Sequence, residues 1–159
     1  MSDLAIPYHE GDIEFEGTVL CAIIQADDVA LLSTSIKALQ LKINVFVDWC
    51  AKCGFMSVNM IKSLAMAFGS ISHKEDLILY IGDTPMLWTI EYTFIGVTFT
   101  CTHRNIFKRH YSTKQNKAAH VVRAALAAEG YTGPLPILEG LLLYLARVDP
   151  HLTFGLLGC

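Results

Sequence analysis

Two adjacent aspartates are the residues best suited to chemistry. Asp27 and Asp28 lie between two short apolar runs, in residues 23–32 (IIQADDVALL). An unpaired carboxylate is costly to bury, so the pair must reach solvent or a ligand. Two interpretations stay open. The pair forms a polar turn, as aspartate often does, or it binds Mg²⁺ (or Mn²⁺), which takes hard oxygen ligands. Two such ions can clamp a phosphoryl displacement.

The neighbouring residues predict the elements that position this pair. Residues 19–24 and 29–32 are apolar runs of strand length, so they predict a tight hairpin with the aspartates at its tip. Residues 12–16 alternate like a strand, and Gly17 allows a turn. Residues 33–35 supply capping side chains for an amphipathic helix, and Gly54 ends it. Its apolar face consists of Ile36, Leu39, Ile43, Phe46, Val47 and Cys50, whereas Lys42 is placed elsewhere.

Further strands and two helices are expected downstream. Strands are predicted at residues 64–68, 77–81, 86–90 and 94–100, with turns at residues 70–76 and 82–85. A helix would begin at Ser112 or Thr113 and run to Glu129, stopped by Gly130. A last helix would cover residues 137–148, stopped by Pro150. The predicted fold class is α+β: an antiparallel sheet with a packed helix (residues 1–102), followed by a small helical region (residues 103–159).

Composition excludes several classes of protein. Of 159 residues, 53% are hydrophobic and 17% are charged, which is unlike a disordered chain. No apolar run reaches the roughly 20 residues of a membrane-spanning helix. The first residues lack the basic start and apolar core of a signal peptide. We therefore expect an intracellular protein, nuclear or cytoplasmic, with no membrane partner and with its five cysteines reduced.

Charge is strongly segregated along the chain. Residues 1–28 hold seven carboxylates and no lysine or arginine. Residues 103–123 hold six of the twelve cations and no carboxylate. Such a basic segment suits either a polyanionic partner or a solvated helix face, and charge alone does not decide between them.

The order of these motifs resembles the reverse transcriptase domain of non-LTR retrotransposons. That family carries a YxDD hairpin, matched here by the sequence QADD at residues 25–28. Its next signature, Gly-Leu or Gly-Phe followed by Asn and Lys-Thr or Lys-Ser, is matched by Gly54-Phe55, Asn59 and Lys62-Ser63. A Tyr-Leu-Gly-like strand follows, matched by residues 94–96. The resemblance covers about residues 12–130, the second half of the palm and the start of the thumb.

The resemblance implies roles for individual residues. Asp27 and Asp28 would be metal ligands, and Lys62 would lie near the incoming dNTP or the departing pyrophosphate. The residues that would contact the RNA template and DNA primer duplex are Gln25, Gly96, Arg104, Lys108, Arg109, Lys114, Lys117 and Arg123. Judged from the residues alone, Lys62 is equally consistent with a solvated lysine. Gly96 is likewise consistent with a bulge in a strand.

Two departures from the family qualify these implications. Gln25 replaces the usual aromatic residue, and the family's upstream catalytic aspartate has no counterpart. None of the upstream acidic residues, Asp3, Asp12, Glu14 and Glu16, lies in a matching motif. We therefore expect this chain to be inactive by itself as an RNA-directed DNA polymerase. It would need a missing palm and fingers segment. The alternatives are a non-catalytic nucleic-acid-binding module and a self-associating remnant of the same fold.

A second set of possible metal ligands is Cys50 and Cys53 with Cys101 and His103. A tetrahedral zinc site normally uses two tight pairs of ligands. Here only Cys50 and Cys53 form a C-x-x-C pair, and Cys50 belongs to the apolar face of the predicted helix. Buried free thiols are the favoured interpretation.

Overall fold

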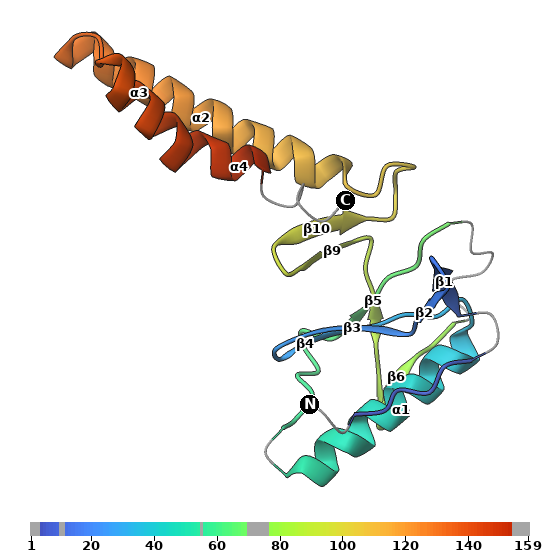
Figure 1. Cartoon of the computed structure of the whole chain (residues 1–159). Coiled ribbons are helices and arrows are strands. Elements are labelled where there is room, and N and C mark those ends of the chain that lie inside the picture. The colour runs from blue at the N-terminus through green and yellow to red at the C-terminus, as the bar shows by residue number, and fades with distance from the viewer. Residues whose placement is uncertain (1–3, 10–11, 55, 70–76, 154–159) are drawn as a thin grey trace. The chain divides into compact units, whose positions relative to one another are not determined.

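A computed structural model of the chain describes residues 4–9, 12–54, 56–69 and 77–153 (Figure 1). It divides into two compact units, Met1–Ile90 and Glu91–Cys159. From the sequence, the boundary between the sheet region and the helical region was predicted to lie between residues 102 and 103. The unit boundary falls earlier because the hairpin before the helices packs against the first of them. As predicted, the chain is of the α+β class, and helices and short strands both contribute to it.

Three tight hairpins contribute most of the strands of the first unit. β1 (Ile13–Phe15) pairs with β2 (Thr18–Leu20), β3 (Ala22–Gln25) with β4 (Asp28–Leu31), and β6 (Tyr80–Ile81) with β7 (Thr84–Pro85). Each hairpin has a two-residue turn. In the first turn both central residues, Glu16 and Gly17, have positive φ (50° and 75°). This is the geometry of a type I′ turn, whose twist matches that of the strands.

The helix α1 (Ile36–Cys53) forms as predicted and organises the core of this unit. Gly54 ends it in the left-handed conformation, with φ of 69°. Ser35 is the N-cap residue, but its hydroxyl makes no capping bond, and its N–H donates to Ser33 Oγ at 3.3 Å. The apolar face of α1 packs on the core, which consists of Ile43, Ala65, Leu79 and Ile81 with Leu31, Ile36, Leu39, Val47, Val58, Met86 and Trp88 around it.

The prediction that the strands form one antiparallel sheet is wrong. The described strands form five two-stranded pairs, and β5 (Leu64–Ala65) pairs with β8 (Leu87–Trp88) in parallel. The strands are only two to four residues long, too short for the apolar pattern to set which neighbours pair. The turn expected at residues 70–76 lies outside the described residues.

The second unit is a hairpin followed by packed helices. β9 (Glu91–Phe94) pairs with β10 (Val97–Thr100), so the strand predicted at residues 94–100 is in fact interrupted by a turn at Ile95 and Gly96. The long helix α2 (Lys108–Thr132) packs against the π-helical turn η2 (Tyr144–Val148) and against α4 (Asp149–Thr153). α3 (Ile137–Leu143) leads directly into η2 (Figure 1).

The predicted ends of these helices were wrong. α2 begins at Lys108 and passes through Gly130, because the positive φ that ends it falls at Gly133, whose N–H donates to Glu129 O at 2.8 Å. The last helix continues through Pro150. A proline ring clashes with the carbonyl four residues back, and the wider π turn just before Pro150 relieves this conflict. No helix among the described residues is long and apolar enough to span a membrane.

Candidate metal and nucleic-acid site

The tip of the β3–β4 hairpin carries the two aspartates, but not in the predicted register. Ala26 and Asp27 form the turn, with Ala26 at φ 52°, and Asp28 is the first residue of β4, paired with Gln25. The prediction that both aspartates occupy the turn is therefore wrong by one residue. Gln25, Asp27 and Asp28 are all exposed to solvent. The hairpin brings these three polar side chains together at one end of a two-stranded ribbon.

The other end of this hairpin is anchored to the core. Leu31 packs against the core cluster beneath α1, and Leu32 N donates to Cys21 O at 2.8 Å. Between anchor and tip, Ile23 and Ile24 are 46% and 40% exposed. The two residues project from opposite faces of β3. Apolar surface therefore remains open on both faces of the ribbon behind the carboxylates.

A buried ion pair, missed by the sequence reasoning, fixes the base of the hairpin. Lys42 Nζ lies 2.7 Å from Asp12 Oδ2, and both side chains are only 1% exposed. Lys42 Nζ also donates to Leu32 O at 2.7 Å. Asp12 accepts two further bonds, from Ser33 Oγ at 3.0 Å and from His9 N at 2.7 Å. One carboxylate thus joins α1, the end of β4 and the segment before β1.

The surroundings of Asp12 favour its charged form. Burial acts to raise the pKa of Asp12, but hydrogen bonds from Lys42, the His9 backbone and Ser33 outweigh it, so the pKa lies below its ordinary value of 3.8. The prediction that Lys42 lies away from the packed face of α1 was wrong. A signal was present in its spacing, because Lys42 follows Leu39 by three residues and directly precedes Ile43, and both of these residues pack in the core.

The donor set at the hairpin tip fits a divalent metal only in part. Two carboxylates are enough for an ion that takes its other ligands from water and phosphates. No group of three or more His, Cys, Asp or Glu side chains able to hold a metal occurs within the described ranges. Within the described residues, Asp27 and Asp28 are thus two exposed carboxylates at one hairpin tip without a third possible ligand beside them.

Lys62 lies in a turn organised by Asn59. Asn59 Oδ1 accepts hydrogen bonds from the N–H groups of Ile61 and Lys62, both at 3.1 Å. Ser63 closes the turn, since its N–H and its Oγ both donate to Asn59 O, at 3.0 and 2.8 Å. The spacing from Asn59 to Lys62 and Ser63 thus has a local structural cause, and it presents Lys62 on an exposed turn between α1 and β5.

The predicted nucleic-acid contacts of the second unit are distributed over three places. Gly96 sits in the β9–β10 turn with φ 75°, so it is not a bulge within a strand. Arg104 is exposed in the segment between β10 and α2. The remaining cations lie on α2, which advances about 100° per residue. This rotation places Lys108, Arg109 and Arg123 on one side, and Lys114 and Lys117 on another.

One of these cations already has a partner within the chain. Arg109 Nε lies 2.8 Å from Glu91 Oε2, with the two side chains 64% and 32% exposed. A pair this exposed contributes only about 0–1 kcal/mol, so a phosphate could displace Glu91 at little cost. The buried neighbour His110 has a different role. Its Nδ1 accepts the N–H of Thr98 at 3.2 Å and so ties α2 to β10.

The four cysteines among the described residues do not form a second candidate metal centre. Cys21, Cys50, Cys53 and Cys101 are all free thiols, and Cys50 is 4% exposed on the packed face of α1. Burial raises the pKa of the Cys50 thiol, and the neighbouring Cys53 adds to this effect. A thiol that resists ionisation is a poor metal ligand at neutral pH.

Comparison with known proteins adds no family or fold assignment to this geometry: no family model, no curated protein and no solved structure matches the chain.

Proposed function

We propose that the chain is the C-terminal part of the palm, with the start of the thumb, of a reverse transcriptase domain. Its family chemistry is RNA-directed DNA synthesis by two-metal nucleotidyl transfer. The observation that carries the proposal is the exposed Asp27 and Asp28 pair at the tip of a tight hairpin, directly before a helix that packs on strands. The resemblance described from sequence places the same elements in the same order.

Further features support the proposal without depending on the aspartates. The turn at Asn59 gives Asn59 and Ser63 a structural role at this spacing, and it exposes Lys62. The second unit begins with a hairpin and continues into a cation-rich helix, as a primer-contacting hairpin followed by a thumb would. In this arrangement the β3–β4 ribbon would belong to a larger palm, and further elements packed on the two faces of the ribbon would cover Ile23 and Ile24.

Each residue group has a distinct part in the proposed chemistry. Asp27, with Asp28, would hold Mg²⁺ or Mn²⁺, whose charge would offset that of the phosphates during displacement of pyrophosphate from the incoming dNTP. Lys62 would attract the triphosphate. Gln25 would lie close to the primer end. The cations of α2 would contact backbone phosphates of the RNA template and DNA primer duplex, which positions the duplex without reading its sequence.

Metal binding at the hairpin gives a direct test of this proposal. Mn²⁺ added to the ¹⁵N-labelled chain should broaden the amide signals of residues 25–29 by paramagnetic relaxation. Asp27→Asn should remove most of this broadening. The β6–β7 hairpin provides a matched control, because Asp83 is a single exposed aspartate in a two-residue turn. Asp83→Asn should leave the broadening at residues 25–29 unchanged.

The outcome of the Mn²⁺ titration decides between a metal site and a polar turn. Equal broadening at both hairpins, or broadening that survives Asp27→Asn, would show that the aspartates only keep the turn solvated. Primer extension on an RNA template with Mg²⁺ is expected to give no product, because within the described part of the chain no third carboxylate joins Asp27 and Asp28. Extension that Asp27→Ala abolishes would overturn the expectation that the chain is inactive alone.

A non-catalytic nucleic-acid-binding module is the second candidate, and the cation distribution on α2 favours it. Lys108 and Arg123 are both exposed on one side of α2. If binding alone is the function, an RNA–DNA hybrid should bind with an affinity that falls steeply with salt. The affinity should then be unaffected by Asp27→Asn and weakened by Arg123→Gln. Concentration-dependent oligomers without any hybrid binding would instead favour a self-associating remnant.

A further inference from the structure

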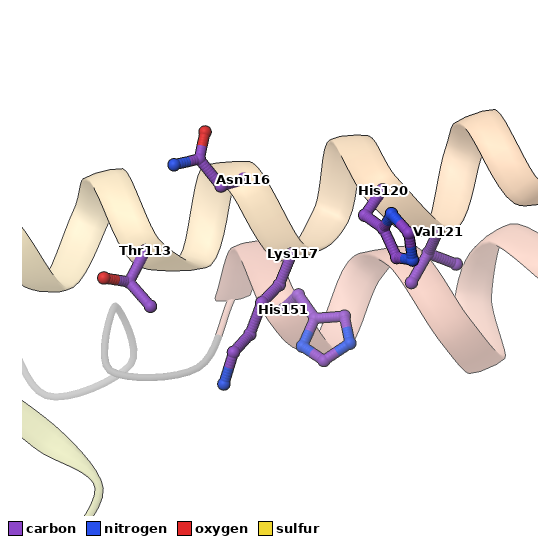
Figure 2. A pocket seen from close by; sticks show the side chains of 6 residues that line it. All are labelled: Thr113, Asn116, Lys117, His120, Val121 and His151. Carbon is purple, nitrogen blue, oxygen red and sulfur yellow. The ribbon is translucent and has the colours of Figure 1, made fainter.

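An open groove lies between α2 and α4, within the second unit. Its lining consists of Thr113, Asn116, Lys117, His120 and Val121 from α2 and of His151 from α4 (Figure 2). Its volume of about 500 Å³ is many times the roughly 30 Å³ that one water molecule occupies in the liquid. The groove can therefore admit a polar ligand together with part of its hydration shell.

Four of the residues that line the groove lie on an exposed side of α2. Thr113, Asn116, Lys117 and His120 follow one another at intervals of three, one and three residues, so they share one side of α2. All four of these side chains are exposed to solvent, and α4, which packs against α2, contributes the half-buried His151 to the same groove. Val121 is the only aliphatic residue among the six that line the groove.

The lining side chains share one chemical property, since each polar member can donate a hydrogen bond. Lys117 carries a full positive charge, and His120 and His151 each present a ring N–H. Thr113 contributes a hydroxyl and Asn116 an amide. No carboxylate is among the lining residues, and Asp149, two residues before His151 in α4, is not one of them. A set of donors with net positive charge is complementary to an anion rich in acceptor oxygens.

We propose that this groove binds a phosphate group, held by Lys117 and by the rings of His120 and His151, with Thr113 completing its hydrogen bonds. Figure 2 shows how the three basic side chains come from facing helices, two from α2 and one from α4. The site does not rest on the metal chemistry proposed for the β3–β4 hairpin, which belongs to the other unit. The phosphate is either a free ion or part of a polynucleotide backbone.

The histidine rings provide a direct readout of occupancy. The ring C–H signals of His120 and His151 are followed by NMR while sodium phosphate replaces sodium chloride at constant ionic strength. Saturable shifts of both signals are expected, with the other histidine signals unchanged. Lys117→Gln should weaken phosphate binding about 2- to 5-fold, the effect of losing one solvent-exposed ion pair. Lys37→Gln, which removes an exposed lysine from α1 in the other unit, should have no effect.

A second titration, with an eight-residue oligodeoxythymidine, separates the two sources of phosphate. If the oligonucleotide shifts the same two rings and phosphate competes with it, the groove binds a polynucleotide backbone. If only inorganic phosphate shifts them, the groove binds the free ion. The proposal is overturned if the shifts grow linearly without saturation, or if they are equal in the parent and the Lys117→Gln chain. Circular dichroism of each variant checks that its helices remain folded.

Discussion

Replacing Lys42 by methionine should destabilise the first unit more than most single substitutions would. Lys42→Met keeps the approximate length of the side chain and removes its charge. Asp12 would then be a buried carboxylate that has lost its cation, since the Nζ–Oδ2 bond of 2.7 Å joins two side chains that are only 1% exposed. Leu32 O would lose its donor from Nζ as well. Both losses occur in the folded state, so the free energy of unfolding must fall.

The expected size of this loss is about 3–5 kcal/mol, the usual consequence of removing one partner from a buried ion pair. Whole domains are stable by only about 5–15 kcal/mol, so the variant should be close to unfolding. A second substitution, Asp12→Asn, removes the uncompensated charge. The double variant Asp12→Asn/Lys42→Met should therefore recover about 2 kcal/mol of the loss, which makes the two substitutions strongly non-additive.

Urea unfolding followed by tryptophan fluorescence measures this effect in the correct unit, because Trp49 and Trp88 both lie in the first unit. Lys37→Met, an exposed substitution in the same helix, is the control and should change stability by no more than about 0.5 kcal/mol. A loss below about 1 kcal/mol for Lys42→Met, or additive effects in the double variant, would refute the conclusion that this pair is buried and coupled.

Three further predictions concern the first unit. The pKa of Asp12 is lower in the folded than in the unfolded chain, so its contribution to stability is complete above the unfolded value of about 4 and is lost as the pH falls through the lower, folded value. Urea titrations at pH 7 and pH 3 should show this loss in the parent, and Asp12→Asn should show a smaller difference between the two pH values. Because burial raises the pKa of Cys50, iodoacetamide at pH 8 should alkylate Cys50 more slowly than Cys53. Peptide mass mapping measures both rates, and equal rates would contradict the burial of Cys50. Gly54→Ala should lower the free energy of unfolding by about 1 kcal/mol in a thermal or urea melt, because the left-handed φ of 69° is unfavourable for a residue with a Cβ. No described atom lies within 4 Å of the Cβ position, so no steric clash adds to this cost. An unchanged melt would mean that the helix ends differently.

The sequence was most informative where one periodic pattern extends over many residues. α1 was predicted because its apolar residues recur at helical spacing over about four turns and a glycine follows the helix. The two-residue hairpins were harder to predict. At the β3–β4 tip, the turn uses Ala26 with positive φ, a conformation that no propensity assigns to alanine, so the register was displaced by one residue.

Contacts between distant residues could not be predicted from local patterns. The alternating pattern of residues 12–16 puts Asp12 on the same strand face as Glu14 and Glu16, yet Asp12 is held by a lysine thirty residues away. The parallel pairing of β5 with β8 joins segments of two residues, too short for any period to be recognised. In the candidate site, the carboxylate pair and the turn at Asn59 were accessible to sequence reasoning, because their residues are adjacent or nearly so. The groove between α2 and α4 was not, because His151 approaches α2 only after the chain has reversed direction.

The pairing of β5 with β8 has a consequence for the order in which the first unit folds. Each hairpin closes at a two-residue turn, whereas β5 and β8 meet only after the chain between Ala65 and Leu87 has formed a loop. The chain must lose the conformational entropy of closing that loop before the β5–β8 pairing contributes any stabilising free energy. The hairpins and α1 should therefore be protected early in pulsed hydrogen exchange during refolding. The amide of Thr89, which donates to Ala65 O, should be protected last.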